Sequence, residues 1–70
     1  MRYLVVVEET STGYSAYSPD VPGCVATAAS VEDVQREMAT TIAFHLEGMR
    51  KEGLSPPAPH SLSLCVDVPA

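Results

Sequence analysis

The stretch Tyr14-Ser-Ala-Tyr-Ser-Pro-Asp-Val-Pro-Gly-Cys-Val25 decides the fold of this 70-residue chain. It predicts an aromatic strand that ends at Pro19, because proline cannot donate to a β-ladder. A rigid turn through Pro22 and Gly23 follows, and a short apolar strand over residues 24–28 comes next. The stretch contains no phosphate loop, metal-ligand spacing or nucleophile elbow, so it favours contact with a partner over catalysis.

The segments on either side predict a hairpin and a helix. Residues 2–7 read as a strand that is apolar on both faces, which indicates cover on both sides, and residues 8–13 supply polar turn residues that end in glycine. Ser30 is a suitable N-cap, and Gly53 follows two basic residues, so the helix is expected between them. Its apolar residues recur at spacings of three and four and predict one core-facing stripe: Val31, Val34, Met38, Ile42, Leu46 and Met49.

The end of the chain predicts a fourth strand. Residues 55–59 contain three prolines and form a stiff connector. Residues 61–68 then alternate between apolar and polar side chains, as a half-buried strand does. The element order is therefore β-β-β-α-β, an α+β fold with one long helix packed on one face of a single sheet, and residues 1–70 are expected to form one domain.

Composition narrows the function classes. Nine acidic residues against four basic ones give a net charge of −5, which disfavours direct binding of nucleic acid and favours encounter with a basic partner. Two cysteines and no signal-peptide pattern predict a reduced, cytoplasmic setting, and no apolar run is long enough to span a membrane. No cofactor or metal is expected, because His45 and His60 pair with neither cysteine at a familiar ligand spacing.

Several motifs in order carry a resemblance across nearly the whole chain. They are Arg2-Tyr3 opening a strand that ends in Glu8, Gly13–Tyr17, Pro19–Cys24, the helix start Ser30–Asp33, Phe44-His45-Leu46-Glu47, and Pro56–Pro59. Together they resemble the HicB-like antitoxin family, the antitoxin half of the HicA–HicB toxin–antitoxin systems. The resemblance implies a partly degraded ribonuclease H-like fold with strand order 3-2-1-4. It also implies a non-catalytic module that neutralises a small basic mRNA-cleaving toxin by contact. Many members add a C-terminal DNA-binding segment, which is not expected here because only a few residues follow the fourth strand.

Two enzymatic interpretations and one orphan interpretation stand beside this one. Cys24, His45 and Asp20 are the residue types of a thiol-hydrolase triad, but their spacing has no diagnostic value and a buried structural cysteine is the commoner case. A remnant metal nuclease would use Glu8, Asp20 and Asp67, although solvated charges at strand ends explain them more simply. The chain is therefore not expected to be an enzyme. The third interpretation is a stand-alone domain that self-associates without a toxin.

Candidate contact residues follow from the same reasoning. Phe44 points away from the apolar stripe, onto the polar side of the helix, which favours a homodimer or higher homo-oligomer for a core this small. The tyrosines lack the basic groove of an RNA binder, so packing or partner contact is favoured. The predicted partner- or self-binding residues are Tyr14, Tyr17, Asp20, Phe44 and Glu47. The residues assigned to architecture are Pro19, Pro22, Gly23 and Cys24, and His45 is expected to be half-buried on the flank of the stripe.

Overall fold

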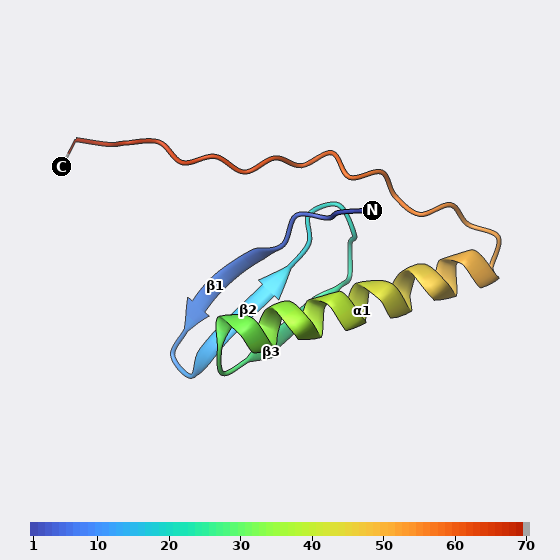
Figure 1. The fold of residues 1–70 in the computed structure, drawn as a ribbon, viewed down its shortest axis with the longest axis horizontal. Helices are drawn as coiled ribbons and strands as arrows, with labels where there is room; N and C mark the ends of the chain where they lie inside the picture. The colour runs from blue at the N-terminus through green and yellow to red at the C-terminus, as the bar shows by residue number, and fades with distance from the viewer. Residues whose placement is uncertain (70) are drawn as a thin grey trace.

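The computed structural model of the protein describes residues 1–69. Three strands and one helix follow in the order β1 (Val6–Thr10), β2 (Gly13–Tyr17), β3 (Val25–Ala28) and α1 (Val31–Lys51). The strands form one antiparallel sheet in the order β1-β2-β3, and α1 crosses one face of it, packed against β2 and β3 (Figure 1). The protein is therefore an α+β structure with its helix on one side of the sheet.

The first hairpin differs from the prediction in its bounds. The expected turn over residues 8–13 is wrong, because Glu8 pairs with Ser15 and Glu9 pairs with Tyr14 in the β1–β2 ladder. Residues 2–5 precede β1, since β2 ends opposite Val6 and leaves them no ladder partner. The turn is thus short, and cross-strand pairing outweighs the polarity of the two glutamates.

Gly13 opens β2 at a point where another part of the backbone comes close. A Cβ built there would lie 2.4 Å from the carbonyl oxygen of Ala28. Only a residue without a side chain fits this approach of β2 to the end of β3. Gly13 thereby fixes how tightly the second and third strands meet.

The turn from Ser18 to Cys24 points two polar side chains, those of Ser18 and Asp20, into the protein. Ser18, Asp20, Val21 and Cys24 are buried, whereas the prolines and Gly23 are exposed. Gly23 has a φ of +89°, in the left-handed region that glycine tolerates best. The Ser18 hydroxyl donates to the carbonyl of Leu4 at 2.8 Å, so the turn is attached to the chain just before β1.

α1 begins and ends close to where its local sequence predicts. The Ser30 hydroxyl accepts a hydrogen bond from the N–H of Asp33 at 3.1 Å, as an N-cap does. At the other end the N–H of Leu54 donates to the carbonyl of Met49 at 2.9 Å, which closes the last turn. Within residues 1–69, no helix combines the length and the apolarity that crossing a bilayer requires.

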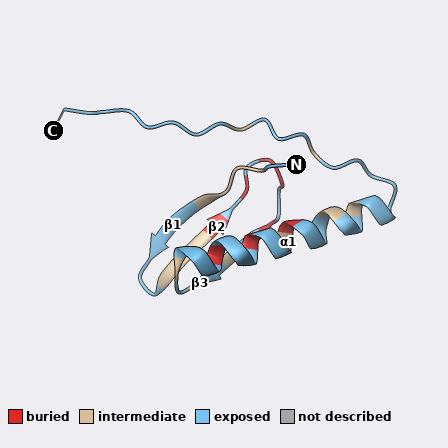
Figure 2. Cartoon of the chain, viewed as in Figure 1, coloured by how far each residue is buried: buried red, intermediate tan, exposed pale blue. Residues whose placement is uncertain are grey.

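The core lies between one face of the sheet and the first half of α1 (Figure 2). Its buried apolar residues are Ala16, Val21, Cys24, Val34, Met38 and Ile42. The helical stripe is thus buried at its centre, whereas Val31, predicted to belong to it, is 44 % exposed at the first helical position. Leu46 and Met49 are half-buried.

The second half of α1 extends past the sheet. A helix of 21 residues is about 31 Å long, whereas a strand of 5 residues spans about 17 Å. The prediction that His45 is half-buried is wrong for this reason, since its side chain is exposed although it lies near the core-facing direction of the helix. The overhang leaves the C-terminal end of α1 with little cover.

The predicted fourth strand is not part of the sheet. Residues 55–69 run as an extended segment with no ladder partner among the described residues, and the segment passes away from β1 toward the far end of the molecule (Figure 1). Apolar and polar residues alternate along this segment as predicted, but the apolar face is exposed instead of packed against the core. Its apolar side chains are 73–92 % exposed: Leu62, Leu64, Val66 and Val68.

Candidate partner-binding surface

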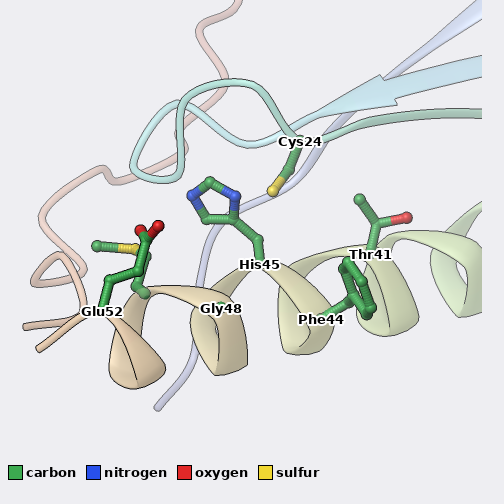
Figure 3. A pocket seen from close by; sticks show the side chains of 7 residues that line it. Cys24, Thr41, Phe44, His45, Gly48 and Glu52 are labelled. Atoms are coloured by element: carbon green, nitrogen blue, oxygen red, sulfur yellow. The ribbon is translucent and has the colours of Figure 1, made fainter. Parts of the chain in front are cut away.

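Phe44, in the second half of α1, is 81 % exposed. It borders a surface hollow of about 340 Å³ together with Thr41 and Gly48. Gly48 follows Phe44 by one helical turn, and no atom lies within 4 Å of the position that a Cβ would take there, so the glycine leaves room beside the ring. Figure 3 shows the ring beside Thr41 on α1, and Cys24, from the turn before β3, lines the same hollow. This ring and its hollow form a surface that a second protein can fill.

The charges near Phe44 are mainly acidic. Glu37 precedes it by two helical turns on the same side, and Glu52 lines the hollow itself. Glu47 forms an ion pair with Arg50, and that guanidinium lowers the pKa of the Glu47 carboxyl through a hydrogen bond and its charge. The pair is exposed, so it adds little to stability, and both groups remain accessible. We call Glu37, Thr41, Phe44, Gly48 and Glu52 the Phe44 surface.

The two candidate tyrosines lie on opposite faces of β2. Tyr14 is half-buried and packs against the core on the α1 side. Tyr17 is 43 % exposed on the open side of the sheet, where it pairs with Val6 on one neighbouring strand and with Val25 on the other. This open row crosses all three strands. Tyr17 is therefore accessible to a partner, whereas most of Tyr14 is already occupied.

Asp20 is 2 % exposed and faces the C-terminal segment instead of solvent. Its Oδ2 accepts the backbone N–H of His60 and of Ser61, both at 3.0 Å, and its Oδ1 accepts the Ser61 hydroxyl at 2.6 Å. These bonds, the Ser61 hydroxyl first, lower the pKa of Asp20 below its ordinary value of 3.8, against the opposing effect of burial. The carboxylate thus anchors the start of the tail, and its direct contact with a partner stays a prediction.

A second contact holds the connector before this anchor. The hydroxyl of Tyr3 donates to the carbonyl of Pro57 at 2.7 Å. Sequence reasoning found neither this bond nor the roles of His60 and Ser61. The partners are separated by 54 positions in one case and by 40 and 41 in the others, and no local pattern marks such pairs.

Cys24 and His45 line the same hollow as Phe44, and Figure 3 shows the imidazole pointing from α1 toward the thiol. Burial raises the pKa of the Cys24 thiol, which keeps it protonated and poorly nucleophilic. Asp20 is committed to the tail through both oxygens, so it does not orient this imidazole. The three residues are not assembled as a hydrolase triad.

The acidic residues of the nuclease interpretation are also dispersed. Glu8 is exposed in β1, Asp20 is buried in the turn, and Asp67 is exposed near the end of the tail. Among residues 1–69, no three His, Cys, Asp or Glu side chains lie close enough together to hold a metal ion. The described geometry gives no cluster through which divalent cations could act.

Comparison with known proteins matches this arrangement to one family. The family model for the HicB-like antitoxin of bacterial toxin-antitoxin systems matches residues 3–70. The chain is 27 % identical to one chain of the solved HicA3 and HicB3 toxin-antitoxin complex, with a TM-score of 0.70, and the match covers 84 % of this chain and 69 % of that one.

A relative of unknown function shares nearly the full length of the chain. It is the uncharacterized 14.9 kDa protein in the rep-hol intergenic region of Haemophilus phage HP1 (strain HP1c1), 28 % identical over 69 residues. The match covers 99 % of this chain and 52 % of the phage protein, so the chain spans about half the length of this curated relative.

Proposed function

The chain belongs to the HicB-like antitoxin family of bacterial toxin–antitoxin systems, and on that premise we propose that it is a non-catalytic module that binds and neutralises a small basic toxin by direct contact. The observation that carries the proposal is the match to a chain of a solved toxin–antitoxin complex, at 27 % identity over most of both chains. The family assignment confirms the resemblance read from the motifs. We further propose that residues 1–70 act as one domain in the cytoplasm.

The Phe44 surface is the part of the molecule that we assign to the toxin. An exposed aromatic ring beside a hollow is the kind of anchor that dominates protein interfaces. Acidic side chains border it, and they complement a basic toxin of the kind that HicA-type partners are. Glu47, three positions after Phe44 on α1, adds a further acidic group whose ion pair with Arg50 can be exchanged for one with the toxin.

A non-catalytic role is supported by the state of the candidate catalytic groups. The Cys24 thiol is buried and protonated, and Asp20 serves the tail. Neutralisation by contact needs neither group to react. It needs only that the covered toxin surface include the groups that cleave mRNA.

The deciding experiment is co-expression with the product of the adjacent small open reading frame. We expect the tagged toxin to arrest growth alone, growth to resume when this chain is co-expressed, and the two proteins to purify together. A matched pair of variants locates the contact: Phe44→Asp abolishes rescue, whereas Val25→Asp, at another exposed apolar site on the open face of the sheet, preserves it. Absence of both rescue and co-purification with the unaltered chain would refute the proposal.

Two other functions have distinct outcomes. A stand-alone self-associating domain would form its oligomer but capture no toxin. A remnant nuclease would cleave an RNA–DNA hybrid with Mg²⁺ or Mn²⁺ and lose that activity in the Asp67→Asn variant. The dispersed positions of Glu8, Asp20 and Asp67 argue against the latter.

A further inference from the structure

We propose that residues 62–68 of one copy form the missing fourth strand on the free edge of β1 in a second copy, and that the exchange is reciprocal, which gives a two-fold dimer. The proposal concerns self-association and is independent of the toxin. It follows from three features: an unpaired tail, a fixed exit point for that tail, and an open site of matching shape and chemistry.

The tail has the pattern of a half-buried strand without the burial. Leu62, Leu64, Val66 and Val68 occupy one face and are 92 %, 82 %, 73 % and 74 % exposed. The intervening residues are Ser63, Cys65 and Asp67, which suit the opposite face. Exposure of four large apolar side chains in one row to water is unfavourable, and a contiguous apolar surface of this kind marks an interaction site. The regular alternation fits a strand added to the edge of a sheet.

The start of the tail is held in place. Asp20 binds the backbone N–H groups of His60 and Ser61 and the Ser61 hydroxyl, so the direction in which the chain leaves is fixed at that point. Tyr3 holds Pro57 just before it. Beyond the anchor the described segment has no ladder partner and extends along the longest dimension of the molecule, which is 50 Å (Figure 1). The anchored tail is therefore presented outward, away from its own sheet.

The site that receives it lies beside β1. This strand is at one edge of the sheet, and α1 packs against β2 and β3, so the edge remains open. A hollow of about 440 Å³ separates the chain before β1 from α1. Its lining is mostly apolar and includes Tyr3, Val5, Ile42, Ala43 and Leu46. A strand added to the β1 edge would place one row of side chains over this hollow.

The charges of Glu8 and Asp67 favour one direction of pairing between the tail and β1. That direction in turn favours the tail of a second copy. We place Cys65, the centre of residues 62–68, opposite Val6, the first residue of β1, with both side chains on the open face of the sheet. A parallel strand would then put Asp67 directly opposite Glu8, and like charges in that position destabilise a sheet. An antiparallel strand puts Asp67 opposite Leu4, next to Arg2, and places Val66 over Val5 on the face toward the hollow.

The tail of the same copy would pair with β1 in the parallel direction, which the charges disfavour. In Figure 1 the segment after Ser61 runs in the same general direction as β1, so folding back beside its own strand would give the parallel arrangement. A second copy related by a two-fold axis can present β1 in the opposite direction. Because each copy then gives one strand and receives one, the exchange closes as a two-fold dimer, and the β1 edge of each copy is covered.

Disulfide trapping in the full chain tests the pairing directly. We expect the Val6→Cys variant, oxidised under mild conditions, to form a disulfide with the native Cys65 of a second molecule and to run as a covalent dimer on a non-reducing gel. Two matched controls should remain uncrosslinked: Val6→Cys combined with Cys65→Ser, and Val5→Cys, whose side chain lies on the other face. A link formed within one molecule, or no link at all, would overturn the proposal.

Sedimentation across a dilution series provides the second arm. The unaltered chain is expected to be a dimer, and Leu64→Asp to raise the dissociation constant by about 100-fold, since it places a charge opposite Val7 on the apolar face of the added strand. Ser63→Lys introduces a charge on the outer face of the tail, opposite Glu8 and of the other sign, and should leave the dimer intact. Because residues 62–68 lie outside the core, circular dichroism should show unchanged folding in both variants. A monomeric unaltered chain, or a Leu64→Asp variant as dimeric as Ser63→Lys, would refute the exchange.

Discussion

The carboxylate of Asp20 binds Ser61, 41 positions later in the chain, through both the backbone N–H and the hydroxyl of that serine. This relationship joins the turn after β2 to the start of the tail. It explains why an acidic residue is buried in the Pro-Asp-Val-Pro-Gly turn, and it gives the prolines on either side a physical purpose. They stiffen a loop that must present one carboxylate inward.

Replacing Asp20 by alanine should release the tail. The N–H groups of His60 and Ser61 lose their acceptor, so we expect their amide hydrogens to exchange on the order of tenfold faster or more, with a lower melting temperature of the whole chain. The amide of Ala16 in β2 should exchange faster only to the extent that the lower global stability of the variant requires. Glu37→Ala, which removes an exposed carboxylate from α1, serves as the control, and unchanged exchange at His60 and Ser61 in the Asp20 variant would contradict this role.

The same anchor predicts an acid-sensitive contribution to stability. The Ser61 hydroxyl bond and the two N–H bonds lower the folded-state pKa of Asp20 below 3.8. A group with a depressed folded pKa stabilises the protein above its unfolded value, and this stabilisation is lost as the pH falls from about that value through the lowered folded one. Glu47 is lowered in the same direction by Arg50, but solvent screens this exposed pair and weakens its effect.

Urea unfolding at a series of pH values measures this effect. The stability advantage of the unaltered chain over Asp20→Asn should be constant above the titration range and should shrink as the pH drops below 3.8. The amide of asparagine keeps one acceptor oxygen but carries no charge, so the comparison isolates ionisation from shape. An advantage that stays constant down to the acid limit would show that the Asp20 charge does not stabilise the fold.

Local sequence signals predicted α1 well, because its capping bonds involve neighbours. Ser30 and Asp33 are three positions apart, and the spacing that gives the apolar stripe is set by the helix itself. The first strand was misplaced for the opposite reason. Glu8 and Glu9 look like turn residues in isolation, and their partners on β2 decide that they belong to a strand. Pairing across a sheet is a property of two segments, and one segment alone does not contain it.

The tail marks the limit of periodicity as a guide. Alternation over residues 61–68 predicts which side chains share a face, but it carries no information on which strand the segment joins. The candidate site divides in the same way. The prediction that Phe44 points away from the core needed only helical geometry, and its ring is 81 % exposed. The burial of Asp20 depends on a tail that lies far along the sequence.

Substituting alanine at Gly13 and at Gly48 should change the free energy of unfolding in opposite directions. A Cβ on Gly13 would meet the carbonyl oxygen of Ala28 at 2.4 Å, so Gly13→Ala should destabilise the chain by about 1–3 kcal/mol. Gly48 lies within α1 with open space around it, and Gly48→Ala should stabilise the chain by about 0.5–1 kcal/mol, because alanine has the higher helix propensity. Denaturant unfolding of both variants gives the two values. Equal effects of the same sign would mean that the close approach between β2 and β3 does not constrain the fold.

Phe44 should matter for binding and not for folding. Its ring is 81 % exposed, so Phe44→Ala should change the free energy of unfolding by less than about 0.5 kcal/mol. If the ring anchors the toxin, the same variant should weaken toxin affinity on the order of tenfold or more, as removal of a central aromatic does at other interfaces. Titration calorimetry with the purified toxin measures this, with Val25→Ala as a control of similar exposure on the open face of the sheet.

Gly48→Ala provides a second test of the Phe44 surface, because it narrows the hollow beside the ring while strengthening the helix. Weaker binding by a more stable chain would separate the Phe44 surface from stability, whereas full affinity in both helix variants would move the toxin contact elsewhere.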